Sequence, residues 1–423
     1  MEFPTTALKS FIEDAANSPF SINNLPYGAF QQKGTNQINI GTAIGNYVLN
    51  LTLLESESLL KTPNNILVFN QDSLNLFAAQ GPKVWSSIRK RLKSLLSQDN
   101  QELQNNSALL KKVLIPLNEV TMQLPFKIGG YTDFYASENH ATNVGRLFRP
   151  NDNALLPNWK HIPVGYNGRA STVFTNGTAI HRPKGQIKSP TSDNPIFTTT
   201  KKLDFELELG FFVGTGNPDG QPIPVEEAKN HIFGLVLLND WSARDIQAFE
   251  YQPLGPFLSK SFATSISPWV VPYEAIAQAM TQLPKQNPEP VAYLYQDNPK
   301  QPDIQLRVEL QPSGSTERTL LCETNSKELY WSMEQMLAHH TVNNCIMRPG
   351  DLLGTGTISG QDKSSWGSLL ELSFNGKEPI TLKDGKQRSF LEDGDTVIMS
   401  GYCQIGDEKI GFGTLEGTIH PCE

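Results

Sequence analysis

The stretch Leu203-Asp-Phe-Glu-Leu-Glu-Leu209, which continues into Gly210-Phe-Phe-Val213, alternates apolar and acidic residues. In a β-strand, successive side chains point to opposite faces, so the leucines and Phe205 share one face and Asp204, Glu206 and Glu208 share the other. Carboxylates two positions apart lie about 7 Å from each other and repel when they are partly buried. Two interpretations remain open: a solvated strand face, or oxygen ligands for a hard cation such as calcium or magnesium.

Two more acids occupy positions that a cation site would use. Asp240 follows the apolar run 232–238, where the predicted strand ends in polar residues. Asp133 follows the turn-like sequence Gly129-Gly-Tyr-Thr132. Each of them alone is typical of a cap or turn. Sequence spacing does not bring distant segments together, so the convergence of these acids with Glu206 and Glu208 is a hypothesis.

The segments around this strand indicate the architecture. Before about residue 120, strand-like runs at 38–40 and 47–51 are separated by Gly41 and Gly45, and apolar spacing predicts a helix over 84–96 and a second helical run that ends near Pro116. Beyond residue 120 the pattern is one of short strands, interrupted by one clear helix with a predicted cap at 325–328. We predict a mostly β fold with some α, in two domains, 1–120 and 121–423.

Composition excludes several classes of protein. The 423 residues carry 35 basic and 43 acidic side chains, a net charge of −8, without a long basic run, which argues against nucleic-acid or anionic-membrane partners. Four widely spaced cysteines indicate neither a disulfide framework nor a zinc site. Residues 1–18 do not have the pattern of a signal or transit peptide, and no apolar window is long enough to span a bilayer. We therefore expect a cytoplasmic protein.

Three short motifs need a separate interpretation. In Gly354-Thr-Gly-Thr-Ile-Ser-Gly360 the third glycine comes one position too late for a dinucleotide-binding loop, and Gly255-Pro-Phe-Leu-Ser-Lys260 lacks the second glycine of a phosphate loop. Neither supports a nucleotide cofactor. His339 and His340 at the end of the predicted helix are more typical of a helix C-terminus than of a metal pair.

Several longer motifs occur in one order along the chain: Tyr131-Thr-Asp-Phe-Tyr135, His140-Ala-Thr-Asn143, Pro163-Val-Gly-Tyr-Asn-Gly-Arg169, Glu206-Leu-Glu208, Asn239-Asp-Trp-Ser-Ala-Arg-Asp245, Pro253-Leu-Gly-Pro-Phe257 and Gly356-Thr-Ile-Ser-Gly360. With them the chain resembles the fumarylacetoacetate hydrolase family, in its long hydrolytic form. The resemblance implies a small N-terminal SH3-like β-barrel domain, a large C-terminal mixed β-roll domain and a homodimer.

The resemblance also implies an activity: hydrolysis of the carbon–carbon bond of 4-fumarylacetoacetate to fumarate and acetoacetate, the last step of tyrosine and phenylalanine catabolism. One alternative is a related acylpyruvate hydrolase, hydratase or decarboxylase of the same superfamily. Another is a binding or scaffold protein on the same fold, without catalysis. Turnover of the diketo acid separates these possibilities.

The same resemblance implies roles for individual residues and two cations, Ca²⁺ and Mg²⁺. His140 would be the general base and Glu371 the carboxylate that orients it, an arrangement suited to activating water near neutral pH. The remaining groups are the calcium ligands Asp133, Glu206, Glu208 and Asp240; Asp240, Lys260 and Thr264 near a structural magnesium; Arg244, Gln247 and Lys260 around the reacting oxyanion; and Tyr135, Arg149, Tyr166, Gln247, Tyr251 and Thr357 in contact with substrate.

Overall fold

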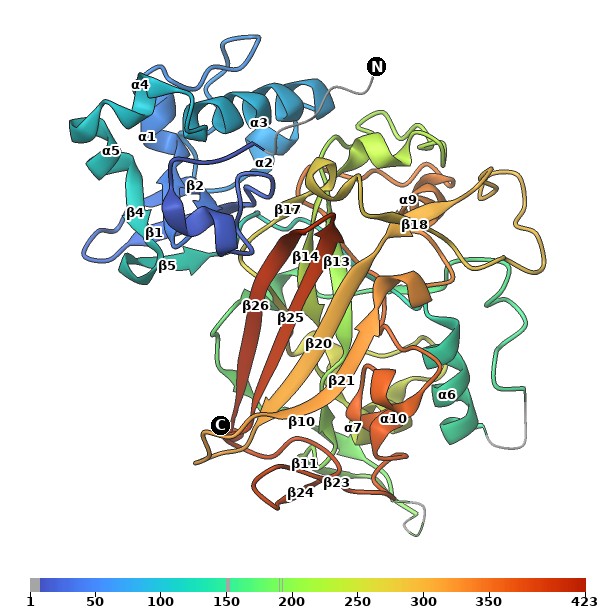
Figure 1. Cartoon of the computed structure of the whole chain (residues 1–423). Helices are drawn as coiled ribbons and strands as arrows, with labels where there is room; N and C mark the ends of the chain where they lie inside the picture. Colours follow the sequence, from blue (N-terminus) through green and yellow to red (C-terminus); the bar gives the residue numbers. More distant parts are fainter. Residues whose placement is uncertain (1–7, 150–152, 190, 192) are drawn as a thin grey trace.

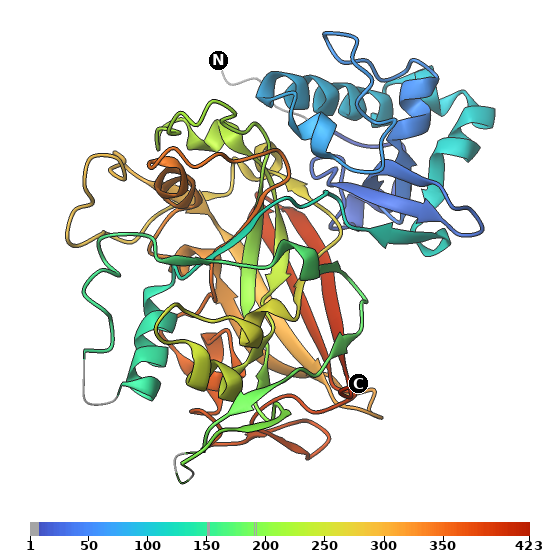
Figure 2. The ribbon, with the colours of Figure 1, turned by 180° about the vertical axis from the view of Figure 1, so that it is seen from behind.

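The computed structural model describes residues 8–149, 153–189, 191 and 193–423. A smaller N-terminal unit lies beside a larger C-terminal unit in both views (Figures 1 and 2). The expectation for residues 1–18 falls partly outside the described residues, since 1–7 are not among them. Within the described residues, no helix combines the length and the apolar character needed to cross a bilayer.

The N-terminal unit is an antiparallel sheet covered by helices. Its strand order is β4-β3-β2-β1-β5. The strands are β1 (Tyr27–Gln32), β2 (Ile38–Ile44), β3 (Tyr47–Asn50), β4 (Leu114–Pro116) and β5 (Val120–Gln123). The helices are α1 (Leu51–Ser56), α2 (Asn75–Ala78), α3 (Pro82–Leu96), α4 (Gln101–Gln104) and α5 (Ser107–Val113). The helix predicted over 84–96 is confirmed as most of α3, which begins with proline at its first turn, where no hydrogen bond is lost.

The prediction that Gly41 interrupts a strand is wrong, because Gly41 lies within β2. A Cβ at this position would come within 2.4 Å of the Val48 side chain and 2.8 Å of the Phe30 ring. The glycine therefore makes room for packing across the sheet instead of ending the strand.

The C-terminal unit is built around two sheets. The central one runs β7-β6-β22-β13-β14-β16-β8, with β17 also paired to β14. Its strands are β6 (Tyr131–Phe134), β7 (Gly165–Asn167), β8 (Val173–Thr175), β13 (Leu207–Val213), β14 (Ile232–Asn239), β16 (Thr264–Ile266), β17 (Val271–Pro272) and β22 (Leu352–Gly354). Every residue of β13 and β14 is buried, so the leucine-rich face and the acidic face are both covered.

The second sheet runs β21-β20-β25-β26-β9 along the outside of the unit (Figure 1). Its strands are β9 (Ile180–His181), β20 (Ile304–Gln311), β21 (Thr319–Asn325), β25 (Thr396–Ile405) and β26 (Glu408–His420). Two-stranded pairs complete the unit: β10 (Lys184–Ile187) with β11 (Ile196–Thr199), β12 (Leu203–Asp204) with β15 (Ser242–Ala243), β18 (Met280–Gln282) with β19 (Lys300–Pro302), and β23 (Ile380–Thr381) with β24 (Gln387–Arg388).

The helices of the C-terminal unit differ from the single helix that was predicted. They are α6 (Glu138–Phe148), α7 (Arg244–Glu250), α8 (Leu258–Ser261), α9 (Met333–Thr341) and α10 (Leu369–Leu372). The cap predicted at 325–328 begins only a 3-10 turn, because Leu329 is extended and forms a bridge to Ser137. The α-helix begins later, after Ser332, whose side chain and that of Gln335 form a capping box.

The two faces of the central sheet pack against different cores. Leu207, Leu209 and Phe211 point into the core of the C-terminal unit, whereas Phe212 and Val236 belong to the core shared with the N-terminal unit. By the alternation of a strand, Glu208 lies on the same face as Phe212. The acidic face of β13 therefore continues into the interface between the two units.

Candidate active site and metal centre

Four buried carboxylates meet at one end of the central sheet. Asp133, Glu206, Glu208 and Asp240 each offer an oxygen, and these oxygens lie within 4.8 Å of one another. All four residues are at most 5% exposed. The hypothesis that the acids converge is thereby confirmed in geometry, and the interpretation as a solvated strand face is wrong for Glu206 and Glu208.

Strand pairing brings the acids together. Asp133 in β6 is opposite Gly354 in β22, and Gly354 is in turn opposite Gly210 in β13, two residues beyond Glu208. Glu208 pairs with Leu238 in β14, two residues before Asp240. Gly354 leaves room for the Asp133 carboxylate, since a Cβ on Gly354 would come within 2.4 Å of an Asp133 carboxylate oxygen.

The buried negative charges of the cluster favour the binding of a cation. Burial and the neighbouring acids raise the pKa of Asp133 and of Glu208 well above their ordinary values. Burial alone would also raise the pKa of Glu206, but Arg244 and Lys260 outweigh it and lower this pKa to about 2. Glu208 Oε1 has no hydrogen-bond partner among the described residues. An orphaned, buried oxygen within an all-oxygen donor set fits a hard divalent cation.

Asp240 is held by three donors. Its Oδ1 accepts from Thr264 Oγ1 at 2.9 Å, and its Oδ2 accepts from Tyr166 Oη and from Lys260 Nζ, each at 2.7 Å. Lys260 Nζ also contacts Glu206 Oε2. Burial alone would lower the pKa of Lys260, but Asp240 and Glu206 raise it above its ordinary value, so the amine stays protonated. Lys260 and Thr264 thus lie beside Asp240, as predicted.

Arg244, at the start of α7, connects the cluster to the cavity. Its Nη1 lies 2.7 Å from Glu206 Oε1 and 3.2 Å from Gln247 Oε1, and its Nε donates to Asp204 Oδ2 at 2.9 Å. Arg244 Nη2 is a buried donor for which the described part of the chain supplies no acceptor. Such a donor beside a cavity can donate a hydrogen bond to an acceptor atom of a ligand.

Asp204 is not part of the four-carboxylate cluster, although the guanidinium of Arg244 contacts both Asp204 and Glu206, as expected for carboxylates on one face. Regular strand geometry stops between β12 and β13, so residues 205 and 206 belong to neither strand. Asp204 instead binds Arg244 and the first amides of α10. The predicted alternation holds for the apolar residues, because Leu203, Phe205, Leu207 and Leu209 all belong to the core of the C-terminal unit.

His140 and Glu371 form a buried hydrogen-bonded pair. His140 lies in the first turn of α6, which Ser137 caps by accepting from the His140 amide, and His140 Nδ1 is 2.7 Å from Glu371 Oε2. Burial alone would raise the pKa of Glu371, but His140, Asn143 and Ser368 lower it, so the carboxylate is ionised and only accepts hydrogen bonds. His140 Nδ1 therefore donates, which leaves the Nε2 lone pair free to take a proton.

One cavity of about 390 Å³ lies in front of these groups. Among the described residues, neither Arg149 Nε nor Thr357 Oγ1, which both belong to its lining, has a hydrogen-bond partner. Glu208, Asp240 and Glu371 do not line it, but each contacts a residue that does. The predicted site residues that line the cavity are Asp133, Tyr135, His140, Arg149, Tyr166, Glu206, Arg244, Gln247, Tyr251, Lys260 and Thr357.

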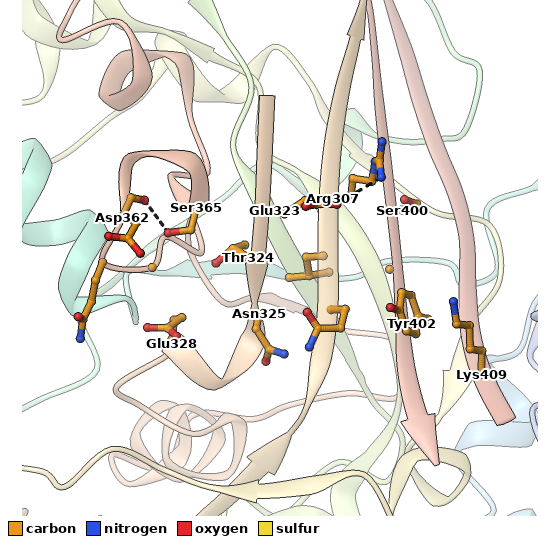
Figure 3. Close-up of a pocket in the computed structure, with 15 residues that line it drawn as sticks. Arg307, Glu323, Thr324, Asn325, Glu328, Asp362, Ser365, Ser400, Tyr402 and Lys409 are labelled. Atoms are coloured by element: carbon orange, nitrogen blue, oxygen red, sulfur yellow. Dashed lines mark hydrogen bonds and ion pairs between the residues drawn. The ribbon is translucent and has the colours of Figure 1, made fainter. Parts of the chain in front are cut away.

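A second, larger hollow of about 830 Å³ lies on the outer face of the sheet formed by β20, β21 and β25 (Figure 3). Arg307, Glu323, Asp362 and Lys409 surround it, and these charged side chains are exposed. Its fifteen described lining residues include none of the predicted site residues. The chemistry indicated by the sequence therefore belongs to the smaller cavity.

Sequence reasoning missed three residues around Glu371. Asn143 Nδ2 donates to Glu371 Oε1 at 2.9 Å, and Ser359 Oγ and Ser368 Oγ donate to Oε2 at 2.9 and 2.8 Å. One signal was present: Ser368-Leu-Leu-Glu371 has the spacing of a capping box. Ser368 does cap α10, but Glu371 turns toward His140 instead of toward the backbone amide of Ser368.

The paired histidines His339 and His340 form hydrogen bonds with residues outside the four-carboxylate cluster. His340 Nε2 lies 2.7 Å from Thr132 Oγ1, and His339 Nδ1 lies 2.9 Å from Tyr293 Oη, both at the end of α9. The interpretation of the pair as a helix C-terminal feature agrees with this position.

Comparisons with known proteins agree along the chain. Residues 23–125 match the family model described as Fumarylacetoacetase N-terminal, and residues 130–420 match Fumarylacetoacetate (FAA) hydrolase C-terminal. The chain is similar to the fumarylacetoacetase of Homo sapiens, 49% identical over 97% of this chain and 99% of the relative, and to that of Dictyostelium discoideum, 48% identical over 98% and 99%. A solved structure of a fumarylacetoacetate hydrolase from Exiguobacterium antarcticum covers 94% of this chain and 99% of its own, with a TM-score of 0.53 at 17% identity.

Proposed function

The chain belongs to the fumarylacetoacetase family, and from this we propose that it hydrolyses the carbon–carbon bond of 4-fumarylacetoacetate to fumarate and acetoacetate. It is a hydrolase that acts on a carbon–carbon bond in a ketonic substrate. The observation that carries the proposal is the joint geometry: four converging carboxylates and the His140–Glu371 pair serve one cavity.

Asp133, Glu206, Glu208 and Asp240 are the residues that would hold a divalent cation, which we propose to be Ca²⁺. When bound, such a cation supplies Lewis acidity toward the two ketone oxygens of the substrate. The described donors are all oxygens, which suits a hard cation better than zinc or copper. We also propose a structural Mg²⁺ near Asp240, Lys260 and Thr264. The contacts of Lys260 and Thr264 with Asp240 support a structural role for these three residues.

His140 takes a proton from water as that water attacks the carbonyl carbon on the fumaryl side. Glu371 accepts the Nδ1 hydrogen and stabilises the imidazolium that forms, as the acid does in a hydrolytic triad. The oxygen of the attacked carbonyl becomes negative and needs donors, and we propose that Arg244 Nη2, Lys260 and Gln247, which line the cavity, supply them. Cleavage then releases fumarate, and the acetoacetate carbon takes up the proton.

We propose that Arg149 and the tyrosines bind the carboxylates at the ends of the substrate. The Arg149 side chain donates from Nη2 to the Ala154 carbonyl at 2.9 Å and keeps Nε without a partner among the described residues. A guanidinium can bind a carboxylate through two parallel hydrogen bonds, and tyrosine hydroxyls add neutral donors. We propose Tyr135, Tyr166, Tyr251 and Thr357 as the other substrate contacts.

The decisive experiment uses purified protein, 4-fumarylacetoacetate and calcium. Loss of the enol absorbance, with fumarate and acetoacetate appearing in equal amounts, is the expected result. A panel of acylpyruvates tests the related hydrolases, and evolution of carbon dioxide tests a decarboxylase. The proposed function fails if none of the diketo acids is cleaved.

Three further expectations remain proposals with direct tests. We propose a homodimer, to be measured by light scattering of the purified chain. We propose a cytoplasmic location, consistent with four free cysteines, to be tested by fractionation. We keep the division into residues 1–120 and 121–423 as a proposal; because β5 extends the N-terminal sheet to Gln123, we expect limited proteolysis to cut first between β5 and β6.

A further inference from the structure

Asp204 is a fully buried carboxylate that makes three hydrogen bonds next to the cavity without lining it. Its Oδ1 accepts from the Leu369 amide at 2.8 Å, and its Oδ2 accepts from the Leu370 amide at 2.9 Å and from Arg244 Nε at 2.9 Å. Its side chain is 0% exposed and that of Arg244 is 3% exposed. The charge of Asp204 is therefore compensated away from water by Arg244, which also contacts Glu206.

The partners of Asp204 lead to two parts of the proposed reaction centre. Leu369 and Leu370 are the first two residues of α10, and the third is Glu371, which binds His140. Arg244 lines the cavity and carries Nη2, which has no partner among the described residues. One carboxylate thus joins the helix that orients the base to the guanidinium that faces the developing negative charge.

We propose that Asp204 is a positioning residue that fixes the His140–Glu371 pair and Arg244 in one relative geometry. The inference rests on the proposed function and assigns a role to a residue outside the acidic cluster. Asp204 neither holds the cation nor touches the substrate. Its effect on rate comes from geometry, because a displacement of about 1 Å between reacting groups can reduce the rate about 100-fold.

The first test is Asp204→Asn. Asparagine offers one oxygen and one NH₂ group, so at least one of the three donors loses its acceptor, and the charge opposite Arg244 is lost. We expect kcat to fall about 100-fold while KM changes less than about threefold. Calcium affinity should stay within about twofold of the unmodified protein, because the four cluster carboxylates are unchanged.

Asp395→Asn is the matched control. Asp395 is also 0% exposed and accepts from Arg388 Nε at 2.8 Å, from Arg388 Nη2 at 3.0 Å and from the Glu392 amide at 2.9 Å. None of its partners lines the active-site cavity. If this variant, compared at equal folded fraction, loses kcat as Asp204→Asn does, the loss reflects general damage from breaking a buried ion pair, and the proposal is overturned.

A second pair of variants decides the question if Asp204→Asn does not fold. Leu369→Pro removes the amide that binds Asp204, at the first helical position, where proline is tolerated. The preceding Ser368 has an extended backbone (φ −148°, ψ 153°), which proline also requires. Leu369→Ala keeps the amide and removes most of the side chain. We expect Leu369→Pro to lower kcat about tenfold more than Leu369→Ala; equal values contradict the proposal.

A readout without turnover separates this inference from the proposed function. The ¹⁵N chemical shifts of the His140 ring report its tautomer and hydrogen bonding. They should change in Asp204→Asn or Leu369→Pro and stay unchanged in Asp395→Asn. If the unmodified protein cleaves no diketo acid, the proposed function fails, and these shifts still show whether Asp204 positions His140. Unchanged His140 shifts with normal kcat refute the positioning role.

Discussion

His140 Nδ1 and Glu371 Oε2 are 2.7 Å apart, although 231 residues separate them in the chain and both side chains are almost completely buried. The carboxylate also accepts from Asn143, Ser359 and Ser368. These four donors keep the Glu371 carboxylate ionised and hold it in one orientation. This arrangement sets the tautomer of His140, with the hydrogen on Nδ1.

Replacing His140 by alanine removes the proposed base and leaves the carboxylate cluster intact. We expect kcat to fall about 10²- to 10⁴-fold, with calcium and fumarate affinities nearly unchanged. Stopped-flow kinetics and titration calorimetry provide the two measurements. Full activity in this variant would assign the proton transfer to another group.

Replacing Glu371 by glutamine should change the acid dependence of stability. The pKa of Glu371 in the folded chain lies below its ordinary value of 4.5, so its ionisation stabilises the fold above that value and this contribution is lost as the pH falls through the folded pKa. The stability advantage of the unmodified chain over Glu371→Gln should therefore be constant near neutral pH and shrink in acid. Urea unfolding between about pH 7 and pH 4 measures it. An advantage that grows in acid contradicts the assignment.

Replacing Ser368 by alanine removes both the cap of α10 and a donor to Glu371. We expect a loss of about 1 kcal/mol in the free energy of unfolding and a kcat about three- to tenfold lower. Ser332→Ala is the control, since Ser332 caps α9 and makes no contact with Glu371. It should cost similar stability and leave kcat unchanged; equal kcat losses would mean that capping alone matters.

Replacing Glu208 by glutamine removes a carboxylate from the proposed cation site. Calcium affinity should fall about 10- to 100-fold, and activity should be recovered in part at high calcium. Glu55→Gln is a matched control: Glu55 is 5% exposed and accepts three backbone amides, from residues 68, 69 and 70, in the N-terminal unit. It should affect stability without changing calcium affinity.

Removing divalent cations should lower the melting temperature as well as the rate. Burial and mutual repulsion raise the pKa of Asp133 and Glu208, so a cation that binds them stabilises the folded chain by mass action. Differential scanning calorimetry with chelator, and then with added calcium or magnesium, measures the effect and shows which ion restores more. A melting temperature that chelation does not change would contradict a cation site here.

Local patterns in the sequence predict much of this structure. The apolar spacing over 84–96 indicates α3, and the alternation at 207–209 correctly places Glu208 on the face opposite its neighbouring leucines. Both follow from short-range geometry, because helix and strand periodicity fix which side chains share a face. The roles proposed for His140 and Glu371 came from the resemblance to a known family, because no local pattern indicates them.

Other features depend on contacts between distant segments, and only the tertiary structure decides them. Asp204 continues the acidic alternation, yet it takes no part in the four-carboxylate cluster and binds Arg244 and α10. Gly41 looks like a strand breaker, yet the side chain of Val48 requires it to be a glycine. The sequence by itself determined which acids and which histidine are available. The pairing of β6, β22, β13 and β14 decided which of them meet, since hydrogen bonding between strands, and not separation along the chain, sets the distances between these side chains.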